Sequence, residues 1–485
     1  MAMTEEAPAR GAGRVAAALR SGPLSVPGFR LLTFGQFAST IGDYCYAVAL
    51  PWLVLSGGGS AASLGIVLAC YGIPRAVLTV PGGSLVDRVG PRVVMLGADT
   101  VRCAATSTLA VLAASQASSL TVLCPVAAVF GACSGVFSPA ALAIMPSLVD
   151  SKHLTSANAV YTSAVQIGSL LGPVLGGILV AAVGPATGFA VDAGSFLASA
   201  ATLALIGRTA AGAASTVAAE AEREPGAVLD AGVVGRAGPA GLAEAELAVL
   251  PGSSDGPAEA ELAGLPRLPD GRAQGAAAGS AAPAPASVRV LLRHAPMFQV
   301  LLLLALTANF ALTGTTEVAL PSLAHARFGA DGFGAILACL AAATLAGAIV
   351  VTRLAGRFRP IPLIAGSCLV AAAAVAAVPF LGGLPGAAAC MAVCGLALGF
   401  DNVLSVTVIQ RWAPPALLGR VVGLVILAGA GSFPLSAFVA GLLTRHLGPA
   451  PVFPIAGALF ALSMLYGLSR REFRDFGAEP EPADG

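Results

Sequence analysis

Seven ionisable side chains lie inside long apolar stretches of this sequence, and their types and spacing indicate what chemistry the protein performs. They are Asp43, Arg75, Asp99, Arg102, Asp192, Glu317 and Asp401. A charge placed in hydrocarbon costs at least roughly 2.5–3.5 kcal/mol, so acids and bases in such surroundings usually pair, bind an ion or substrate, or carry protons. These residues therefore predict binding or proton transfer in an apolar environment.

Asp43 and Arg75 are the pair best suited to carrying a proton. They lie at similar depth in two successive apolar stretches, 31–55 and 63–86. A carboxylate beside a guanidinium in a low-dielectric cavity can gain or lose its proton as its surroundings change. Such a pair can couple a conformational change to proton movement, although a static ion pair would use the same two residues.

Asp99, Arg102 and Asp192 fit structural roles better. Asp99 and Arg102 are three residues apart in one predicted helix and can pair on one face of it. Asp99 lies near the end of that helix that adjoins Asp87 and Arg88, so we expect a structural or gating network there. Asp192 lies near the other end of its own apolar stretch, where we expect its hydrogen bonds to be satisfied structurally.

Several classes of chemistry find no support in the sequence. Lys152 is the only lysine and is not part of a Gly-Lys-Ser/Thr motif, so we expect no ATP site of the P-loop type. The four histidines lie in loops or near predicted helix ends, and no metal-ligand spacing or G-x-S-x-G motif occurs. The nine cysteines lie in apolar stretches and are expected to act as small hydrophobic residues without disulfides. We therefore expect no enzyme activity, no metal and no cofactor.

The elements that must position these residues are membrane-spanning helices. The chain has 485 residues, of which 56% are hydrophobic and 11% charged, and its mean hydropathy is +0.86. Soluble proteins carry roughly 25% charged residues, so the sequence predicts an all-α membrane protein that spans the bilayer many times. The twelve predicted spans are 31–55, 63–86, 92–115, 119–145, 159–183, 186–207, 297–320, 332–353, 361–381, 386–409, 420–444 and 450–469.

The distribution of basic residues predicts the orientation of these spans. With the N-terminus inside, nearly all loop and helix-end arginines lie on the cytoplasmic side, and only Arg327 and Arg445 lie outside. Because cytoplasmic loops are enriched in Lys and Arg, this bias predicts an N-in/C-in topology. The net charge of +1 gives no indication of a nucleic-acid partner.

The spans divide into two halves that resemble each other. The stretch "VALP" occurs at 48–51 and again at 318–321, while "GIVLAC" at 65–70 corresponds to "GAILAC" at 334–339. Matches in the same order predict a duplicated unit of six helices, an arrangement used by transporters with a central cavity. The intervening segment is rich in Ala, Gly, Pro and Glu, which predicts a flexible cytoplasmic linker. The predicted parts are a cytoplasmic segment at 1–30, helix bundles at 31–208 and 289–470, the linker at 209–288 and a cytoplasmic tail at 471–485.

The loop between the second and third spans resembles the signature loop of the major facilitator superfamily. It reads "GGSLVDRVGPRVVML". The resemblance implies the major facilitator fold and a loop that latches the two halves and controls switching between states. The gating residues would be Gly83, Asp87, Arg88, Gly90 and Arg92, together with Asp99 and Arg102. The corresponding loop of the second half has Gly356 in place of Asp87, so any such latch is asymmetric.

A glycine-rich stretch in the fifth span resembles the antiporter motif of drug/proton exporters in this superfamily. The residues are Gly168, Gly172, Pro173, Gly176 and Gly177. Small residues four apart let a neighbouring helix approach closely, so ordinary tight packing would use the same residues. The surroundings resemble the twelve-span group that includes macrolide and enterobactin exporters. One departure is that 119–145 lacks the arginine found in the fourth span of many drug/proton antiporters, so any proton coupling here is arranged differently.

The resemblance implies that the first, seventh and tenth spans line a central cavity. The candidates for proton coupling or substrate contact are then Asp43, Arg75, Glu317, Asp401, Asn402, Gln36 and Asn309. The resulting hypothesis is a monomeric secondary transporter in the cell membrane that exports a small amphipathic molecule, antibiotic- or siderophore-like, by proton antiport. An uptake symporter of the same fold is the alternative. A membrane enzyme or a non-transporting scaffold has little support.

Overall fold

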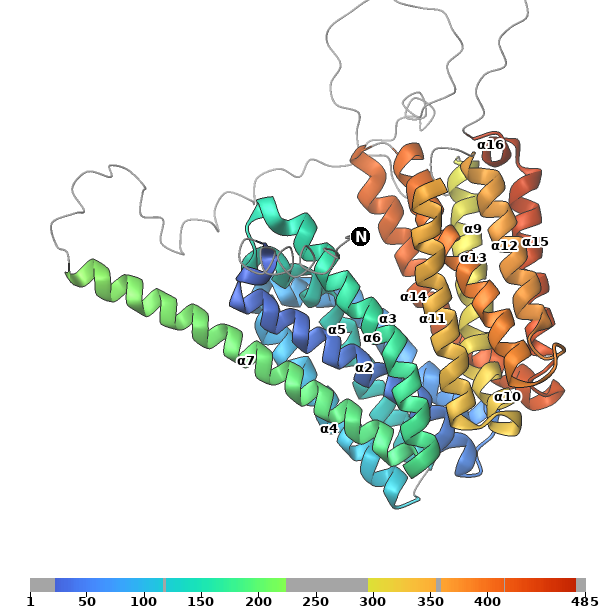
Figure 1. Cartoon of the computed structure of the whole chain (residues 1–485), viewed down its shortest axis with the longest axis horizontal. Helices are drawn as coiled ribbons and strands as arrows, with labels where there is room; N and C mark the ends of the chain where they lie inside the picture. Colours follow the sequence, from blue (N-terminus) through green and yellow to red (C-terminus); the bar gives the residue numbers. More distant parts are fainter. Residues whose placement is uncertain (1–21, 117–118, 224–294, 355–358, 414, 477–485) are drawn as a thin grey trace, which may run out of the picture. The chain divides into compact units, whose positions relative to one another are not determined.

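The computed structural model describes residues 22–116, 119–223, 295–354, 359–413 and 415–476, and within them the chain is helical with no strand. The first half begins with a short 3-10 turn, η1 (Pro23–Ser25), and a second such turn, η2 (Ser151–His153), precedes α6. Its helices are α2 (Pro27–Ser56), α3 (Ala61–Val89), α4 (Pro91–Ala114), α5 (Leu120–Leu148), α6 (Leu154–Val183) and α7 (Pro185–Arg223) (Figure 1). The all-helical prediction is confirmed.

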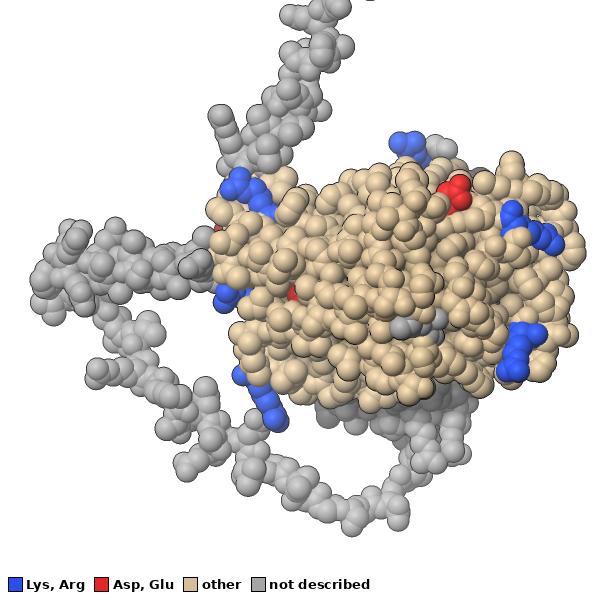
Figure 2. All heavy atoms as spheres, turned by 90° about the horizontal axis from the view of Figure 1, so that it is seen from below, with Lys and Arg blue, Asp and Glu red and all other residues tan. Residues whose placement is uncertain are grey.

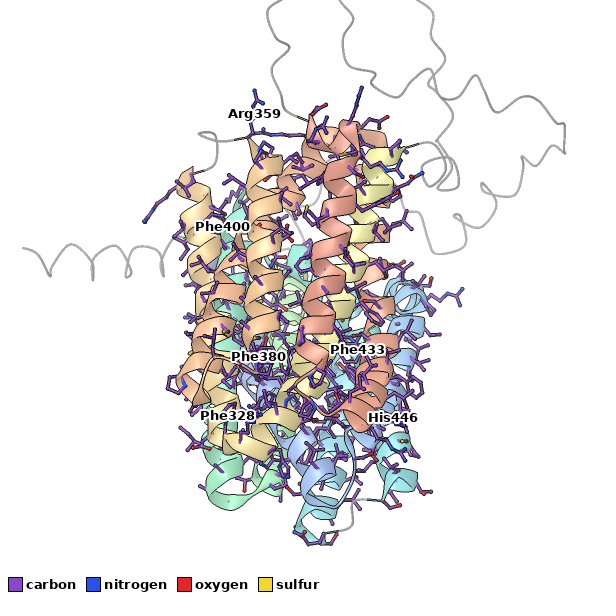
Figure 3. All side chains as sticks on the ribbon, turned by 90° about the vertical axis from the view of Figure 1, so that its right-hand side faces the viewer. Phe328, Arg359, Phe380, Phe400, Phe433 and His446 are labelled. Carbon is purple, nitrogen blue, oxygen red and sulfur yellow. The ribbon has the colours of Figure 1, made fainter. Side chains whose placement is uncertain are left out.

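The second half contains six corresponding spans, of which the first is interrupted. That span consists of α9 (Pro296–Gly314), a π-helical turn η4 (Thr315–Ala319) and α10 (Leu320–Arg327). The others are α11 (Gly329–Leu354), α12 (Pro360–Ala377), α13 (Gly383–Trp412), α14 (Pro415–Leu447) and α15 (Val452–Ser469), followed by the short α16 (Arg471–Arg474). In Figure 3, Arg359 marks one end of this bundle, and Phe328 and His446 lie toward the other.

Eleven helices among the described residues are long and apolar enough to cross a membrane. The helix outside this set is α4, which has 24 residues and carries both Asp99 and Arg102. The outer surfaces of the helices are apolar: Leu142, Val183 and Leu197 are 77%, 72% and 64% exposed. Figure 2 shows one face of the molecule, on which charged side chains are sparse. These surfaces suit contact with lipid.

Some sequence-based predictions fall outside the described residues. The cytoplasmic segment up to residue 21, most of the predicted linker (224–288) and Gly356 belong to this group. The helix α7 continues to Arg223, beyond the predicted end of its span at 207. By contacts the chain forms two units, one made of residues 1–206 with 288–485 and the other of residues 207–287. Both six-helix halves therefore belong to the first unit.

Two connections between helices are formed by the same kind of glycine–proline turn. Gly90 and Gly184 end α3 and α6 with positive φ angles of 91° and 104°, a conformation that glycine adopts without steric cost. Each is followed by a proline, Pro91 or Pro185, at the first position of the next helix, where the missing N–H is no loss. The glycine–proline pairs therefore fix tight turns between α3 and α4 and between α6 and α7.

The two halves repeat one pattern of helix pairing. In the first half α3 packs on α5, α2 on α6 and α4 on α5; in the second half α11 packs on α13, α9 on α14 and α12 on α13. Glycines allow the close approach in corresponding pairs. A Cβ on Gly135 would lie 2.6 Å from the carbonyl oxygen of Arg75, and one on Gly395 would clash with that of Leu340. The predicted duplication is thus present in the packing as well as in the sequence.

The π-helical turn η4 lies directly before a proline that disturbs the α-helical hydrogen bonding. Pro321 lacks an N–H, so the carbonyl of Glu317 has no donor at the usual α-helical position four residues on. The hydroxyl of Ser322 donates to the next carbonyl, that of Val318, at 2.6 Å. A wider turn absorbs the disturbance, and single π turns of this kind are frequent at functional sites. The sequence predicted an uninterrupted span over 297–320; the structure instead places Glu317 inside the π turn.

Candidate functional site

Glycine contacts join the two halves at two related places. A Cβ on Gly177 of α6 would lie 3.0 Å from the Cα of Gly334 on α11, and a Cβ on Gly441 of α14 would lie 3.1 Å from the Cα of Gly65 on α3. Gly65 and Gly334 are the first residues of the repeated stretches "GIVLAC" and "GAILAC". The duplicated sequence therefore supplies equivalent glycines to both contacts between the halves.

Aromatic side chains add further contacts between the halves, close to these glycines. Trp52, near the end of α2, is stacked on Phe333 of α11 with ring centroids 5.7 Å apart. His325 of α10 meets the same indole edge-on at 5.6 Å. Deeper along the interface, Tyr71 of α3 meets Phe433 of α14 edge-on at 5.8 Å. These rings extend the glycine contacts between the halves.

The contacts between the halves gather toward one side of the helix bundle. They involve the ends at which α2 and α6 finish and α3 and α11 begin. Toward the opposite end of α3, apolar side chains face open space instead: Val77 and Val80 are 63% and 67% exposed. The contacts described here therefore close the halves against each other on one side.

Arg75 lies within electrostatic range of carboxylates in both halves. It interacts with Asp43 of α2, on which Arg102 and Asp99 act more strongly, and with Glu317 of the π turn η4. Both carboxyl-bearing residues are half-buried, whereas Arg75 itself is exposed. One base between two acids carries a net negative charge when both acids are ionised, so protonation of either acid brings the group to neutrality. The arrangement can respond to protonation and can attract a cation.

The expected Asp43–Arg75 ion pair is not formed. Within the described residues no salt bridge joins them at 4.0 Å or less. The guanidinium instead donates a hydrogen bond of 3.1 Å to the hydroxyl of Tyr71 and lies 5.6 Å from the centroid of that ring. Tyr71 was not among the predicted partners of Arg75, although its position four residues earlier on one helix face gave a signal. Because the Tyr71 hydroxyl is uncharged, this hydrogen bond does not neutralise Arg75, whose charge can still attract Asp43 and Glu317.

Asp99 and Arg102 form the pair that their spacing predicted. Both are buried, at 0% and 4% exposure, and the Arg102 guanidinium donates to Asp99. The hydroxyl of Ser199 on α7 donates to the other carboxylate oxygen at 2.7 Å. The guanidinium also lies between the rings of Phe137 and Phe196, 4.0 and 4.4 Å from their centroids. This cluster ties α4 to α5 and α7 inside the first half.

The predicted gating loop does not join this cluster. Asp87 and Arg88 are exposed, and neither takes part in a salt bridge within the described residues. Arg92 turns toward α7, where it donates to the carbonyls of Leu203 at 2.7 Å and Ala204 at 3.1 Å. The loop of the first half therefore forms no ion-pair latch within the described residues, and the corresponding loop of the second half (355–358) lies outside them.

The glycine-rich stretch of α6 packs against two helices. A Cβ on Gly168, Gly172 or Gly176 would lie only 3.0, 2.6 or 2.9 Å from Thr40, Tyr44 or Cys45 of α2. Gly177, on the neighbouring face, meets α11 of the other half. Pro173 lies inside a continuous helix. The stretch therefore packs α2 closely and at the same time contributes to the closed side between the halves.

The remaining candidates occupy varied positions. Asp401 accepts hydrogen bonds from Ser405 at 3.1 Å and from the Cys368 thiol of α12 at 3.6 Å, which turns it toward its own half. Asn402 is exposed and Gln36 half-buried. The exposed Asn309 donates to the carbonyl of Ala305 at 2.8 Å. The central group of charges therefore comprises Asp43, Arg75 and Glu317.

The hydrogen bonds of the Asp192 carboxylate were expected to be satisfied within the protein, and the structure differs from this expectation. It is fully buried, and neither carboxylate oxygen has a hydrogen-bond partner in the described part of the chain. The hydroxyl of Ser195 donates to the backbone carbonyl of Asp192 at 2.8 Å.

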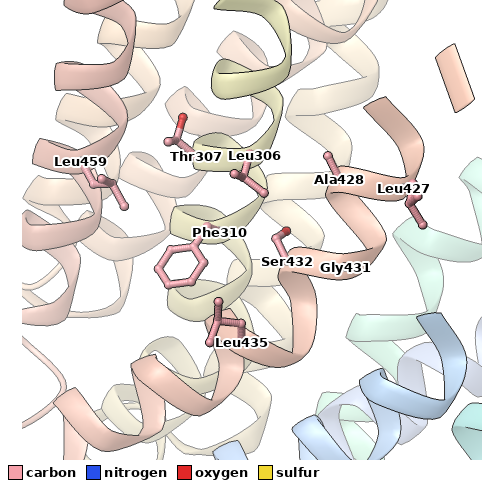
Figure 4. Close-up of a pocket in the computed structure, with 9 residues that line it drawn as sticks. All are labelled: Leu306, Thr307, Phe310, Leu427, Ala428, Gly431, Ser432, Leu435 and Leu459. Atoms are coloured by element: carbon pink, nitrogen blue, oxygen red, sulfur yellow. The ribbon is translucent and has the colours of Figure 1, made fainter. Parts of the chain in front are cut away.

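A separate apolar cavity lies in the second half. It encloses about 320 Å³ between α9, α14 and α15, with Leu306, Phe310 and Leu435 among its walls and the hydroxyls of Thr307 and Ser432 at its edge (Figure 4). None of the charged candidates lines it. The charges and this apolar cavity are thus in different places.

Comparison with known proteins places these features in a wider context. Residues 32–425 match the Major Facilitator Superfamily. The multidrug efflux pump Tap of Mycolicibacterium fortuitum is 30% identical over 203 residues, 40% of this chain and 47% of that protein. The putative multidrug resistance protein MdtD of Yersinia enterocolitica is 31% identical over 150 residues, 31% of each chain. The matched region thus covers less than half the length of these curated relatives.

Solved structures share the fold at low sequence identity. A POT family transporter in complex with 5-aminolevulinic acid superposes with a TM-score of 0.64 at 12% identity, over 92% of this chain and 96% of the other. A bacterial homologue of the iron transporter ferroportin in an inward-facing state gives 0.61 at 15% identity, over 91% and 99%. At such identities these similarities define the arrangement of the helices only.

Proposed function

Since this chain belongs to the Major Facilitator Superfamily and is a multi-pass membrane protein, we propose that it exports small amphipathic molecules from the cell in exchange for protons. The observation that carries the proposal is the central group in which Arg75 faces Asp43 from one half and Glu317 from the other. A carboxylate in each half lets one protonation event alter the attraction across the interface. Proton movement and rearrangement of the halves are then coupled.

The proposed cycle follows from the one-sided closure. In the predicted N-in/C-in orientation the closed side is the outer side, so this state opens toward the cytoplasm. A cationic, amphipathic substrate entering from the cytoplasm would interact with Asp43 and Glu317 and compete with protons for them. Rocking of the halves would open the outer side, where protons would displace the substrate. The resemblance of two efflux proteins over part of the chain, and the glycine motif of α6, favour export over uptake.

The test uses the purified full-length protein in proteoliposomes, with ethidium as a lipophilic cation. For molecules oriented with the cytoplasmic face outward, an acid vesicle interior should drive ethidium inward and raise the internal pH as protons leave. Asp43→Asn and Glu317→Gln should each abolish this gradient-driven accumulation. Ser39→Ala, on the same helix as Asp43, serves as a matched variant that changes no charge, removes a hydroxyl without a hydrogen-bond partner in the described residues, and should retain coupling.

The outcomes distinguish the hypotheses. Accumulation coupled to proton release supports antiport, and its loss in both acid variants places coupling at the central group. Cotransport of ethidium with protons in the same direction would contradict export and favour the uptake alternative. Accumulation that survives both substitutions would contradict the role of these two carboxylates.

A further inference from the structure

The side chain of Asp192 occupies a fully buried position between α7 and α2. It is 0% exposed, and a Cβ added to Gly42 of α2 would lie 2.7 Å from its Oδ1. Neither oxygen has a hydrogen-bond partner in the described residues. An ionised carboxylate buried without a partner is severely destabilising, so the neutral acid is the form that fits this position.

Two unused hydrogen-bond donors belong to the surroundings of Asp192. The hydroxyl of Tyr46 on α2 and the Nε of Arg102 on α4 are both buried without partners. Each of these residues interacts electrostatically with Asp192. A buried donor left unpaired costs roughly 1–3 kcal/mol, and an ionised Asp192 that moved within reach would offer both donors a charged, stronger acceptor. Three unpaired polar groups in one region indicate a second arrangement in which they are paired.

The groups facing Asp192 connect it to the central charges. From α2 it interacts electrostatically with Asp43, Cys45 and Tyr46, and from α4 with Asp99 and Arg102. Arg102 is already paired with Asp99 in the present state. Asp43 is the neighbour of Gly42 in the chain, so the carboxyl of Asp192 adjoins the part of α2 that carries the central acid.

We propose that Asp192 holds a proton in this state and exchanges it with Asp43 during the transport cycle, which makes it a second proton-carrying residue behind the central group. In the exchange the O–H bond of the Asp192 acid breaks and an O–H bond forms on the Asp43 carboxylate, so the total charge is unchanged. Arg102 and Tyr46 then stabilise the Asp192 carboxylate with their free donors. The role in transport rests on the proposed proton-coupled function.

Infrared difference spectroscopy of the full-length protein tests the protonation without any substrate. At neutral pH the wild type minus Asp192→Asn spectrum should contain the C=O stretch of a carboxylic acid. Thr202→Ala, which alters a hydroxyl of the same helix that donates to the backbone carbonyl of Ser199, should keep that band. If Asp192→Asn removes no carboxylic-acid band, Asp192 is ionised and the proposal is overturned.

Transport measurements test the role of Asp192 in the cycle. Asp192→Asn, which resembles the protonated acid, should retain ethidium exchange without a proton gradient but lose accumulation driven by the gradient. Asp192→Glu keeps a titratable carboxyl and should recover part of that accumulation, whereas a purely structural position would tolerate Asn better than Glu. Unchanged gradient-driven accumulation in Asp192→Asn would overturn the proposal.

The two experiments separate this inference from the proposed function. If the wild type does not move ethidium at all, the proposed export of this cation fails, while the infrared band still decides whether Asp192 is protonated. If the wild type accumulates ethidium and Asp192→Asn does so equally, export stands and the role of Asp192 falls.

Discussion

The two halves of this transporter share a pattern of helix packing but differ in their charges. The first half contains Asp43, Arg75, Asp192 and the buried Asp99–Arg102 pair within its spans. The second half has Glu317 and Asp401 at comparable depth, together with the apolar cavity beside Phe310. Packing between helices needs small residues at fixed spacing, which duplication preserves, whereas buried charges need specific partners that each half acquires separately. Most of the ionisable residues within the spans thus belong to the first half.

A second contrast concerns two equivalent prolines. Pro51 and Pro321 end the repeated "VALP" stretches. Pro51 lies inside a continuous α-helix, whereas Pro321 follows the π turn that contains Glu317. The same residue at the same register is thus accommodated in two ways. Only the second half uses the disturbance to reorient an acidic side chain.

The largest expected effect concerns the buried ion pair that only the first half possesses. Arg102→Met should lower the free energy of unfolding by about 3–5 kcal/mol, because Asp99 would remain as a buried charge without its partner. Equilibrium unfolding in mixed micelles measures this. The double variant Asp99→Asn with Arg102→Met should recover most of the loss. A single-variant loss typical of exposed pairs, about 1 kcal/mol or less, would contradict the burial of the pair.

The contacts between the halves should respond equally to equivalent changes. Gly65→Val and Gly334→Val place extra methyl groups against neighbouring backbone and should each cost about 1–3 kcal/mol of closure on that side. Increased quenching of Trp52 fluorescence by acrylamide would report the opening. Gly97→Val and Gly366→Val, at positions where a Cβ meets no atom within 4 Å, are the matched controls. Clearly unequal effects of Gly65→Val and Gly334→Val would show that the two glycine contacts between the halves are not equivalent.

The prolines provide a sharper test of the same equivalence. Pro321→Ala restores an N–H and should convert the π turn to α-helix, rotating Glu317 by about 100°, one residue's share of a helical turn. Proton-driven ethidium accumulation should fall about tenfold, equivalent to about 1.4 kcal/mol. Pro51→Ala should have little effect, since its helix is already continuous. Equal effects of both variants would show that the π turn has no special role.

The smallest effect is expected at Asp401 in the second half. Asp401→Asn keeps an oxygen for the donors Ser405 and Cys368, so the loss of stability should stay near or below about 1 kcal/mol, the value of an ordinary hydrogen bond. Proton-driven transport should be nearly unchanged. A loss of coupling comparable to that of Asp43→Asn would place a further proton site in the second half and weaken the contrast between the halves.

Some parts of the site followed from the sequence and some did not. The spacing of Asp99 and Arg102 correctly predicted an ion pair, because a helix brings residues three apart onto one face. The same reasoning failed for Asp43 and Arg75, since residues on different helices meet only if rotation and tilt allow it. Tyr71 took the position of the expected partner. Asp192 was assigned satisfied hydrogen bonds from its place along the helix, but its rotation toward Gly42 left both oxygens without donors.

The sequence by itself determined the helical membrane fold, the positions of the spans and the duplication of the halves, because hydropathy and glycine spacing act locally along the chain. Only the tertiary structure decided that Arg75 faces acids of both halves, that contacts gather on one side and that Asp192 is unpaired. Those features depend on which helix faces meet, and the direction a helix face points is fixed by packing against all its neighbours together.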